Sequence, residues 1–169
     1  MKTTFAAAVL SLIACTSHAA ELSGSIGATG QGGLTARAGV GFDWDKSWFQ
    51  SETGRLTGYW DAGYTYWESG DAAGGRHSLS FSPVFVYEFA GGDIKPFIEA
   101  GVGVAVFSGS TAGDQDLGSA FNFEDRIGAG LKFGESQRVG IRAIHYSNAG
   151  LKQPNDGIES FALFYSHQI

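Results

Sequence analysis

The feature that most constrains this chain is an alternation of apolar with small or polar residues that recurs along most of its length. In one segment Leu79, Phe81, Phe85, Tyr87 and Phe89 share one parity, while Ser78, Ser80, Ser82 and Glu88 hold the other. A period of two is the repeat of a β-strand, and no segment shows a sustained helical period. The pattern predicts eight strands, at 21–28, 33–44, 54–68, 75–90, 95–107, 119–133, 137–148 and 157–167.

Most of these segments are longer than the strand of about 5–6 residues that is typical of soluble proteins. They match tilted membrane-spanning strands, which need about 9–11 residues, whereas a helical span needs about 18 consecutive apolar residues and none is present. In such a barrel the apolar parity faces lipid and the other parity faces the lumen. We therefore expect an all-β fold, an eight-stranded antiparallel transmembrane β-barrel of the bacterial outer membrane. A soluble lipocalin-like barrel or a sandwich, with the apolar parity inside, is the alternative.

The composition fits a narrow barrel. The 169 residues include 26 glycines, and only 17% are charged, against about 25% in an average soluble domain. The interior of an eight-stranded barrel is just wide enough for side chains to fill, so many lumen positions must be small. The charged residues on the lumen parity carry both signs and could pair inside the barrel: Arg37, Asp61, Glu88, Glu99, Glu124, Arg126 and Arg142.

The N-terminus has the pattern of a secretory signal peptide. Lys2 is followed by an apolar stretch over 5–14 and by the small residues of Ser17-His18-Ala19. We expect removal of residues 1–19 and a mature barrel of residues 20–169. Leu12-Ile13-Ala14-Cys15 offers a rival cleavage site, at which Cys15 would carry a lipid.

With the cut after Ala19 the mature chain has no cysteine, which excludes disulfides and thiolate metal sites. Ten basic and seventeen acidic residues remain, for a net charge of −7. A nucleic acid is not an expected partner, because binding it would call for a concentrated basic patch.

Aromatic residues gather in two groups along the third predicted strand and the turn before it. Trp44, Trp48 and Phe49 flank the turn, and Trp60, Tyr64, Tyr66 and Trp67 approach the other end of the strand. The two groups are typical of the aromatic girdles at the two membrane interfaces. If both termini are periplasmic, the second group lies at the external end.

Three polar residues stand on the apolar, lipid-facing parity of the last two strands. His145 and Ser147 share a face with Ile141, and Glu159 shares one with Phe161. Acyl transfer by serine needs an imidazole to take the hydroxyl proton and a carboxylate to orient that imidazole. Polar groups on a lipid-facing wall carry a cost. The set therefore predicts a serine hydrolase site on the outside of the barrel. The alternative is structural, with His145 and Ser147 bonded to each other near the rim. His77 and His167 are interpreted as solvated or interfacial.

The segments around these residues resemble the lipid A 3-O-deacylase (PagL) family of outer-membrane enzymes. The similar segments are His145-Tyr146-Ser147-Asn148-Ala149-Gly150-Leu151-Lys152, 155–160, 43–48, 54–68 and 122–130. The likeness extends over nearly all the mature chain and includes these segments, and matches of this length are specific.

The resemblance implies an enzyme that removes the ester-linked acyl chain at the 3-position of lipid A in the outer leaflet. It implies Ser147 as nucleophile, His145 as general base and acid, and Glu159 as orienting carboxylate. The oxyanion hole would combine the Asn148 side chain with the Gly150 N–H. Phe123 would line the acyl-chain groove, with Asp125 nearby.

Lipid A or lipopolysaccharide would be the substrate, with outer-membrane lipids as neighbours, and a homodimer stays open. No cofactor and no metal are expected. A non-enzymatic structural or adhesive barrel and a lipid A acyltransferase remain the alternative functions.

Overall fold

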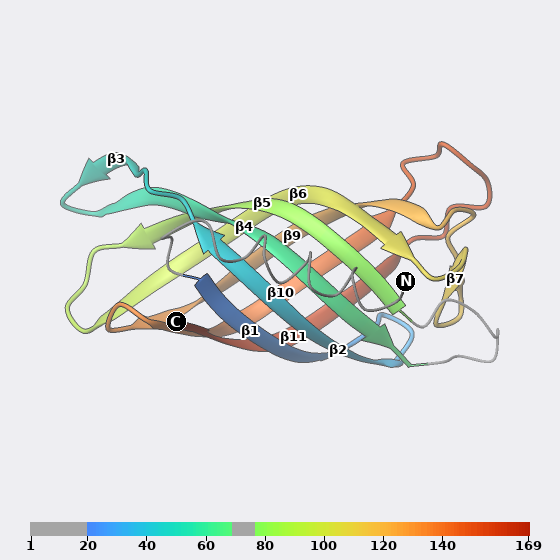
Figure 1. The fold of residues 1–169 in the computed structure, drawn as a ribbon, viewed down its shortest axis with the longest axis horizontal. Coiled ribbons are helices and arrows are strands. Elements are labelled where there is room, and N and C mark those ends of the chain that lie inside the picture. Colours follow the sequence, from blue (N-terminus) through green and yellow to red (C-terminus); the bar gives the residue numbers. More distant parts are fainter. Residues whose placement is uncertain (1–19, 69–76) are drawn as a thin grey trace, which may run out of the picture.

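Eight long strands form the wall of the barrel (Figure 1). They are β1 (Ala20–Ala28), β2 (Leu34–Asp43), β4 (Gly54–Trp67), β5 (His77–Phe89), β6 (Ile94–Phe107), β9 (Phe121–Phe133), β10 (Gln137–Ser147) and β11 (Ile158–Gln168). The computed structural model describes residues 20–68 and 77–169, so the predicted signal peptide, Cys15 and the first two residues of the predicted strand 75–90 lie outside the described residues. Over the described residues each predicted strand is confirmed, with its ends placed within two residues.

Hydrogen bonding between the first and last strands closes the sheet. β1 pairs antiparallel with β11 on one side and with β2 on the other, and every wall strand has two neighbours in the order β1, β2, β4, β5, β6, β9, β10, β11. Three short strands in the described ranges were not predicted from the alternation. β3 (Trp48–Ser51) pairs only with β4, and β7 (Thr111–Ala112) pairs with β8 (Gln115–Asp116) within the β6–β9 loop. No helix in the described ranges is long and apolar enough to cross a membrane.

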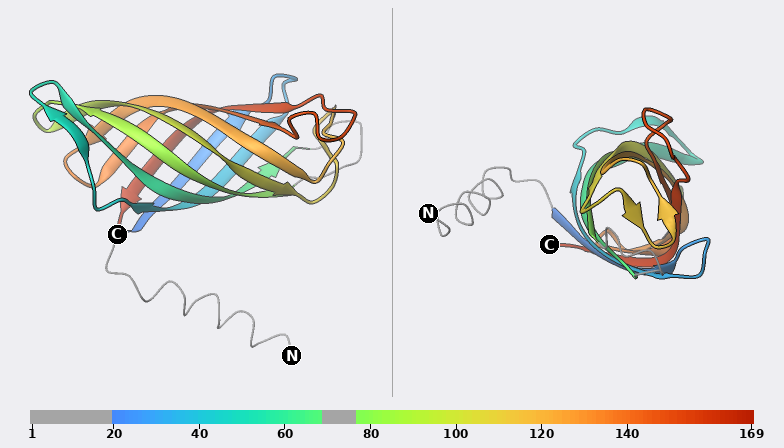
Figure 2. Two further views of the ribbon diagram at one scale, coloured as in Figure 1. Left: turned by 90° about the horizontal axis from the view of Figure 1, so that it is seen from above. Right: turned by 90° about the vertical axis from the view of Figure 1, so that its right-hand side faces the viewer.

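The barrel has two different ends (Figure 2). One, called here the termini end, holds Ala20, Ile169 and the tight turns 90–93 and 134–136. The other, called the loop end, holds the longer connections 29–33, 108–120 and 148–157. β10 runs toward the loop end and β11 returns from it, so His145 and Glu159 both lie near that end.

The two parities of each strand face opposite sides of the wall, as the sequence predicted. On β5, Ser78 and Ser82 are buried, whereas Leu79 is 65% exposed and Phe81 is 49% exposed. The apolar residues therefore coat the outside, which is the arrangement of a membrane barrel. The soluble alternative, which requires an apolar interior and a polar outside, is wrong for this chain.

Charged residues fill the middle of the lumen and pair with one another. The Arg126 guanidinium donates to Asp61 Oδ2 and to Glu124 Oε1, both at 2.7 Å, and Arg37 also binds the Asp61 carboxylate. The Tyr146 hydroxyl donates to the second Glu124 oxygen at 2.8 Å. Buried charges need such partners, because a lone ion loses its hydration without replacement. The predicted internal pairing is confirmed for these residues.

Apolar side chains close the lumen toward the loop end. The cluster comprises Trp67, Ala105, Phe107, Ala112, Leu117, Ile144, Tyr146 and Ile158. Trp67 is fully buried there, and its indole N–H donates to Ser78 Oγ at 2.9 Å. Its expected place in an outer aromatic girdle is wrong, because 67 has the lumen parity of β4, opposite to that of Tyr64 and Tyr66.

Trp60 also departs from the expected grouping. It is outward-facing, but its ring lies 5.9 Å from Trp44 and stacks on Phe81 at 5.5 Å. Trp44 in turn contacts Trp48 and Phe85. Trp60 therefore belongs to the aromatic cluster around the 44–53 turn and not to the group at the loop end.

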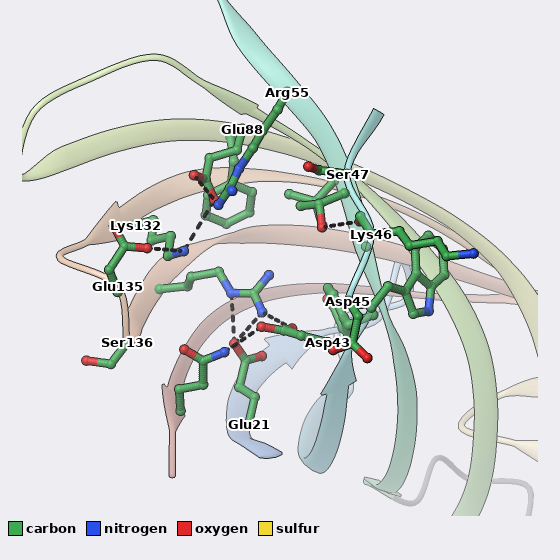
Figure 3. A pocket seen from close by; sticks show the side chains of 18 residues that line it. Glu21, Asp43, Asp45, Lys46, Ser47, Arg55, Glu88, Lys132, Glu135 and Ser136 are labelled. Atoms are coloured by element: carbon green, nitrogen blue, oxygen red, sulfur yellow. Dashed lines mark hydrogen bonds and ion pairs between the residues drawn. The ribbon is translucent and has the colours of Figure 1, made fainter. Parts of the chain in front are cut away.

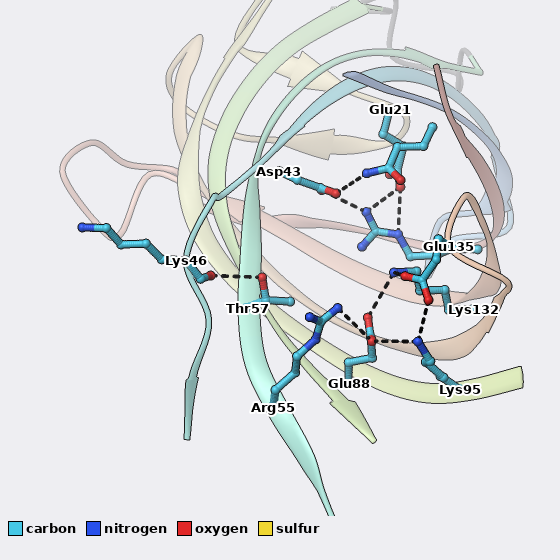
Figure 4. A network of polar contacts seen from close by, with 11 residues as sticks. Glu21, Asp43, Lys46, Arg55, Thr57, Glu88, Lys95, Lys132 and Glu135 are labelled. Carbon is cyan, nitrogen blue, oxygen red and sulfur yellow. Dashed lines mark hydrogen bonds and ion pairs between the residues drawn. The ribbon is translucent and has the colours of Figure 1, made fainter. Parts of the chain in front are cut away.

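A polar pocket of about 220 Å³ opens at the termini end, far from His145 (Figure 3). Arg138 lies across it and binds Glu21 and Asp43, so β10 is tied to β1 and β2. On the other side of the pocket, Arg55, Lys95 and Lys132 surround Glu88 (Figure 4).

Glu135 completes this group in the turn that joins β9 to β10. Hydrogen bonds from Lys95 and Lys132 lower the pKa of the Glu135 carboxyl to about 2, so it stays ionised at ordinary pH. These charges bind each other, and the network joins strands around the rim.

Replacing Asp61 with alanine should destabilise the barrel. Arg37 and Arg126 would lose the carboxylate they share, and removing one partner of a buried pair costs about 3–5 kcal/mol. The measurement is the urea midpoint of unfolding in detergent micelles, followed by tryptophan fluorescence. The exposed Asp93→Ala is the control, and an equal midpoint for the two variants would contradict the structural role of the network.

Candidate active site

The register of the last three wall strands brings three polar residues into one row. His145 of β10 lies directly opposite Glu159 of β11 and directly opposite Asp125 of β9. Directly opposed residues put their side chains on the same face of the sheet. All three face outward, and the row ends on the apolar Val102 of β6. The predicted meeting of His145 with Glu159 is thus present in the structure.

A hydrogen bond joins the imidazole to the carboxylate. His145 Nδ1 lies 2.8 Å from Glu159 Oε1, and the two side chains are 40% and 36% exposed. With Nδ1–H donating to the carboxylate, the neutral ring has its lone pair on Nε2, where a general base accepts a proton. This tautomer is the one that acyl-transfer chemistry requires.

Ser147 is the last residue of β10 and lies two residues beyond His145 on the same face. Its partner across β9 is Phe123, which is half-buried and packs edge-on against Phe121 at 5.5 Å. Ser147 therefore has His145 as its same-face neighbour along β10 and Phe123 as its cross-strand neighbour on β9.

The chain turns sharply just after Ser147. Ala149 and Gly150 have φ of 55° and 77°, and the Leu151 N–H returns to the Asn148 carbonyl at 3.1 Å. Two consecutive positive φ angles characterise the type I′ turn, and glycine is favoured at such positions. Gly150 is the third residue of this turn and follows Ser147 by three positions.

The Asn148 side chain holds this turn from inside. It is fully buried, and its amide donates to the Leu117 carbonyl at 2.7 Å and to the Lys152 carbonyl at 2.8 Å. Both amide hydrogens are therefore used, and Asn148 has the lumen parity of Tyr146. The structure brings His145, Ser147, Glu159, Phe123 and Asp125 to the outer face, but it does not bring the Asn148 side chain there.

The β6–β9 loop is bound to the β10–β11 loop by main-chain bonds as well. The Asp156 N–H donates to the Asp116 carbonyl at 3.1 Å, and the Asp116 N–H donates to the Asp156 carboxylate at 3.2 Å. No role in the site was predicted for residues 108–120. This loop contributes through main-chain groups, which every residue type possesses, so no sequence pattern indicates its role.

Comparisons with known proteins point to one family. The family model described as Lipid A 3-O-deacylase (PagL) matches residues 30–168. A lipid A deacylase PagL of Pseudomonas aeruginosa is 70% identical over 96% of this chain and 94% of its own length. A lipid A deacylase PagL of Bordetella bronchiseptica is 33% identical over 82% of this chain and 84% of its own.

Solved structures show the same architecture. The crystal structure of the outer membrane enzyme PagL superposes with a TM-score of 0.85 at 72% identity, covering 88% of this chain and 99% of that one. A de novo designed transmembrane β-barrel, 9% identical, gives a TM-score of 0.51 over 91% of this chain and 98% of its own, and shares the fold alone.

The fold and its relatives define the class of this protein as an ester-hydrolysing enzyme built on an eight-stranded β-barrel of the bacterial outer membrane. Within that class, the chain belongs to the lipid A 3-O-deacylase (PagL) family.

Replacing Asn148 with alanine should loosen the 148–157 loop and leave the barrel intact. The carbonyls of Leu117 and Lys152 would lose their donors, and an unsatisfied buried polar group costs about 1–3 kcal/mol. Trypsin should then cleave after Lys152 several-fold faster in the folded protein, as followed by mass spectrometry. Gln153→Ala, an exposed change in the same loop, is the control. Equal cleavage rates would contradict the anchoring role.

Proposed function

We propose that this chain hydrolyses the ester-linked acyl chain at the 3-position of lipid A by a Ser147–His145–Glu159 mechanism. The observation that carries the proposal is the 2.8 Å bond between His145 Nδ1 and Glu159 Oε1 on the outward face of the barrel, with Ser147 on the same face. The names of the relatives supply the substrate. The position on the outer wall supports a substrate that arrives by lateral diffusion within the membrane.

In the first half of the reaction the serine becomes acylated. Ser147 Oγ attacks the ester carbonyl carbon, and its proton passes to His145 Nε2. The carbonyl electron pair moves onto the oxygen to give a tetrahedral oxyanion. When this intermediate collapses, the bond to the sugar 3-oxygen breaks and that oxygen takes the proton from His145. Glu159 stabilises the imidazolium while it exists.

In the second half water releases the fatty acid. A water molecule attacks the acyl carbon on Ser147 while His145 Nε2 accepts its proton. Collapse of the second tetrahedral intermediate breaks the bond to Oγ, and the proton returns to Ser147. The products are a 3-hydroxy fatty acid and a lipid A with a free 3-hydroxyl group, and no cofactor is consumed.

The Gly150 N–H is the proposed oxyanion donor, because Gly150 belongs to the turn that directly follows Ser147 in the chain. The Asn148 side chain can join it only by giving up its bond to the Leu117 or Lys152 carbonyl. Phe123, opposite Ser147, is the proposed wall for the acyl chain, and Asp125, opposite His145, is proposed to face the polar part of the substrate.

We place the loop end at the outer face of the membrane. Ala20 and Ile169 lie at the other end, and that end is periplasmic in outer-membrane barrels of this kind. His145 and Ser147 would then lie at the level of the outer leaflet, where lipid A resides.

Replacing Ser147 with alanine should abolish the release of 3-hydroxy fatty acid without unfolding the barrel. The nucleophilic oxygen is lost, and loss of the nucleophile of a serine triad lowers kcat by about 10⁶-fold. Lipid A is analysed by mass spectrometry in cells that express each form, and folding is checked by heat-modifiable gel migration. Ser136→Ala, in a turn at the termini end, is the control.

The same spectra separate the alternatives. A loss of one hydroxyacyl chain that depends on Ser147 supports the deacylase, a gain in mass indicates an acyltransferase, and no change indicates a structural or adhesive barrel. Hydrolysis retained by Ser147→Ala would exclude the serine mechanism.

Glu159→Gln should lower kcat by about 10²–10⁴-fold. The amide keeps the shape of the side chain but loses the charge and can favour the wrong imidazole tautomer. Asp125→Asn, which changes the other residue opposite His145, is the matched variant. Because no hydrogen bond joins Asp125 to the His145 ring in the described structure, we expect a smaller loss of kcat, and the reverse order would assign the orienting role to Asp125.

A further inference from the structure

Gly157 lies directly against the His145 ring. It is buried, it ends the β10–β11 loop just before β11, and its φ is 70°. A Cβ atom built on Gly157 would lie 2.8 Å from His145 Cε1 and 3.5 Å from His145 Nε2. Its other close neighbour would be the Tyr146 carbonyl oxygen, at 3.3 Å.

Two separate constraints therefore require glycine at this position. The positive φ disfavours residues with a side chain, as it does at many turns. The second constraint concerns space, because carbon atoms in contact prefer about 3.5–4.0 Å and a Cβ at 2.8 Å would displace the ring or the loop. Gly134 shows the difference, since its φ is 55° but a Cβ there would meet nothing within 4 Å.

The imidazole is thus restrained at two points. The Nδ1 atom is held by Glu159, and the Cε1 edge rests against the Gly157 main chain. One hydrogen bond alone lets a ring tilt about the bond direction. Contact at the adjacent Cε1 atom removes that freedom and so sets the direction in which Nε2 points.

The surface that Gly157 offers is itself held in place. Ile158 is fully buried in the apolar cluster at the loop end, and Asp156 is bonded to Asp116 of the opposite loop at 3.1 and 3.2 Å. The residues on both sides of Gly157 are therefore fixed to the barrel interior and to the β7–β8 hairpin.

We propose that Gly157 is a positioning residue for the general base, its side-chain-free main chain being the surface that orients the His145 imidazole toward Ser147. This inference rests on the proposed function. Because the proposed role is geometric, a displacement of the His145 ring can be observed independently of hydrolysis.

The kinetic test compares Gly157→Ala with Gly134→Ala, both checked for folding by heat-modifiable migration. Displacing a reacting group by a fraction of an ångström to 1 Å lowers the rate by up to about 10²-fold. We expect Gly157→Ala to lower kcat for lipid A by about 10- to 100-fold with little change in KM. Gly134→Ala, which carries the backbone strain without the contact, should keep the wild-type kcat. An unchanged kcat in Gly157→Ala would overturn the proposal.

The spectroscopic test uses protein labelled with ¹³C at histidine Cε1. The mature chain contains His77, His145 and His167, which gives three resonances to assign. In the wild type, a nuclear Overhauser effect should connect His145 Hε1 with a Gly157 Hα. In Gly157→Ala only the His145 resonance should shift. An absent Overhauser effect in the wild type, or an inactive Gly157→Ala with an unshifted His145 resonance, would refute positioning through this ring.

The two tests also separate this inference from the proposed function. If the wild-type protein leaves lipid A unchanged, the proposed function fails, while the Overhauser effect still decides whether Gly157 supports the ring. If wild-type hydrolysis depends on Ser147 but the Overhauser effect is missing, the proposed function stands and the role of Gly157 is rejected.

Discussion

The structure depends on one constraint, that every main-chain N–H and C=O within the hydrocarbon must find a partner in the protein. The β1–β11 ladder meets it by closing the sheet, so that each wall strand has two neighbours. Closure also fixes the register, because a slip of one residue would exchange the lipid and lumen faces of a strand. The row that holds His145, Glu159 and Asp125 is a product of this register.

A barrel closed with eight strands has an interior that side chains must fill. In this barrel, charged side chains that form ion pairs fill it. Arg126, Asp61 and Glu124 bridge the middle of the lumen, and apolar residues close it toward the loop end. A filled lumen offers no room for a lipid substrate. The outer wall remains for the proposed site. The candidate site residues and the packing residues occupy opposite parities of the same strands: Tyr146, between His145 and Ser147, points inward and binds Glu124.

The sequence predicted what depends on parity and left unpredicted what depends on loops. Alternation alone gave the wall strands and the outward positions of His145, Ser147 and Glu159. The same alternation puts Trp67 on the lumen parity. Its assignment to the girdle was wrong because it followed the neighbouring outward-facing aromatic residues in the sequence and not this parity. The Asn148 bonds to Leu117 and Lys152, and the contact of Gly157 with His145, could not be foreseen, since in each a side chain meets the main chain of a loop whose path the alternation does not predict.

His145, Ser147 and Glu159 lie near the ends of their strands. This position lowers the cost of polar groups on the outer wall and brings them close to the main chain of a loop. Polar side chains on a lipid-facing wall cost most at the middle of the bilayer and little near its interfaces. Ser147 ends β10 and Glu159 is the second residue of β11, so in the proposed orientation both lie toward the interface, where this cost falls. At the same ends the strands pass into a loop that can supply main-chain groups, the Gly150 N–H and the bare surface of Gly157. Deeper in the wall, the His145 ring would be surrounded only by strands whose main-chain groups are already paired. Neither the Gly150 N–H nor the Gly157 main chain would be available there.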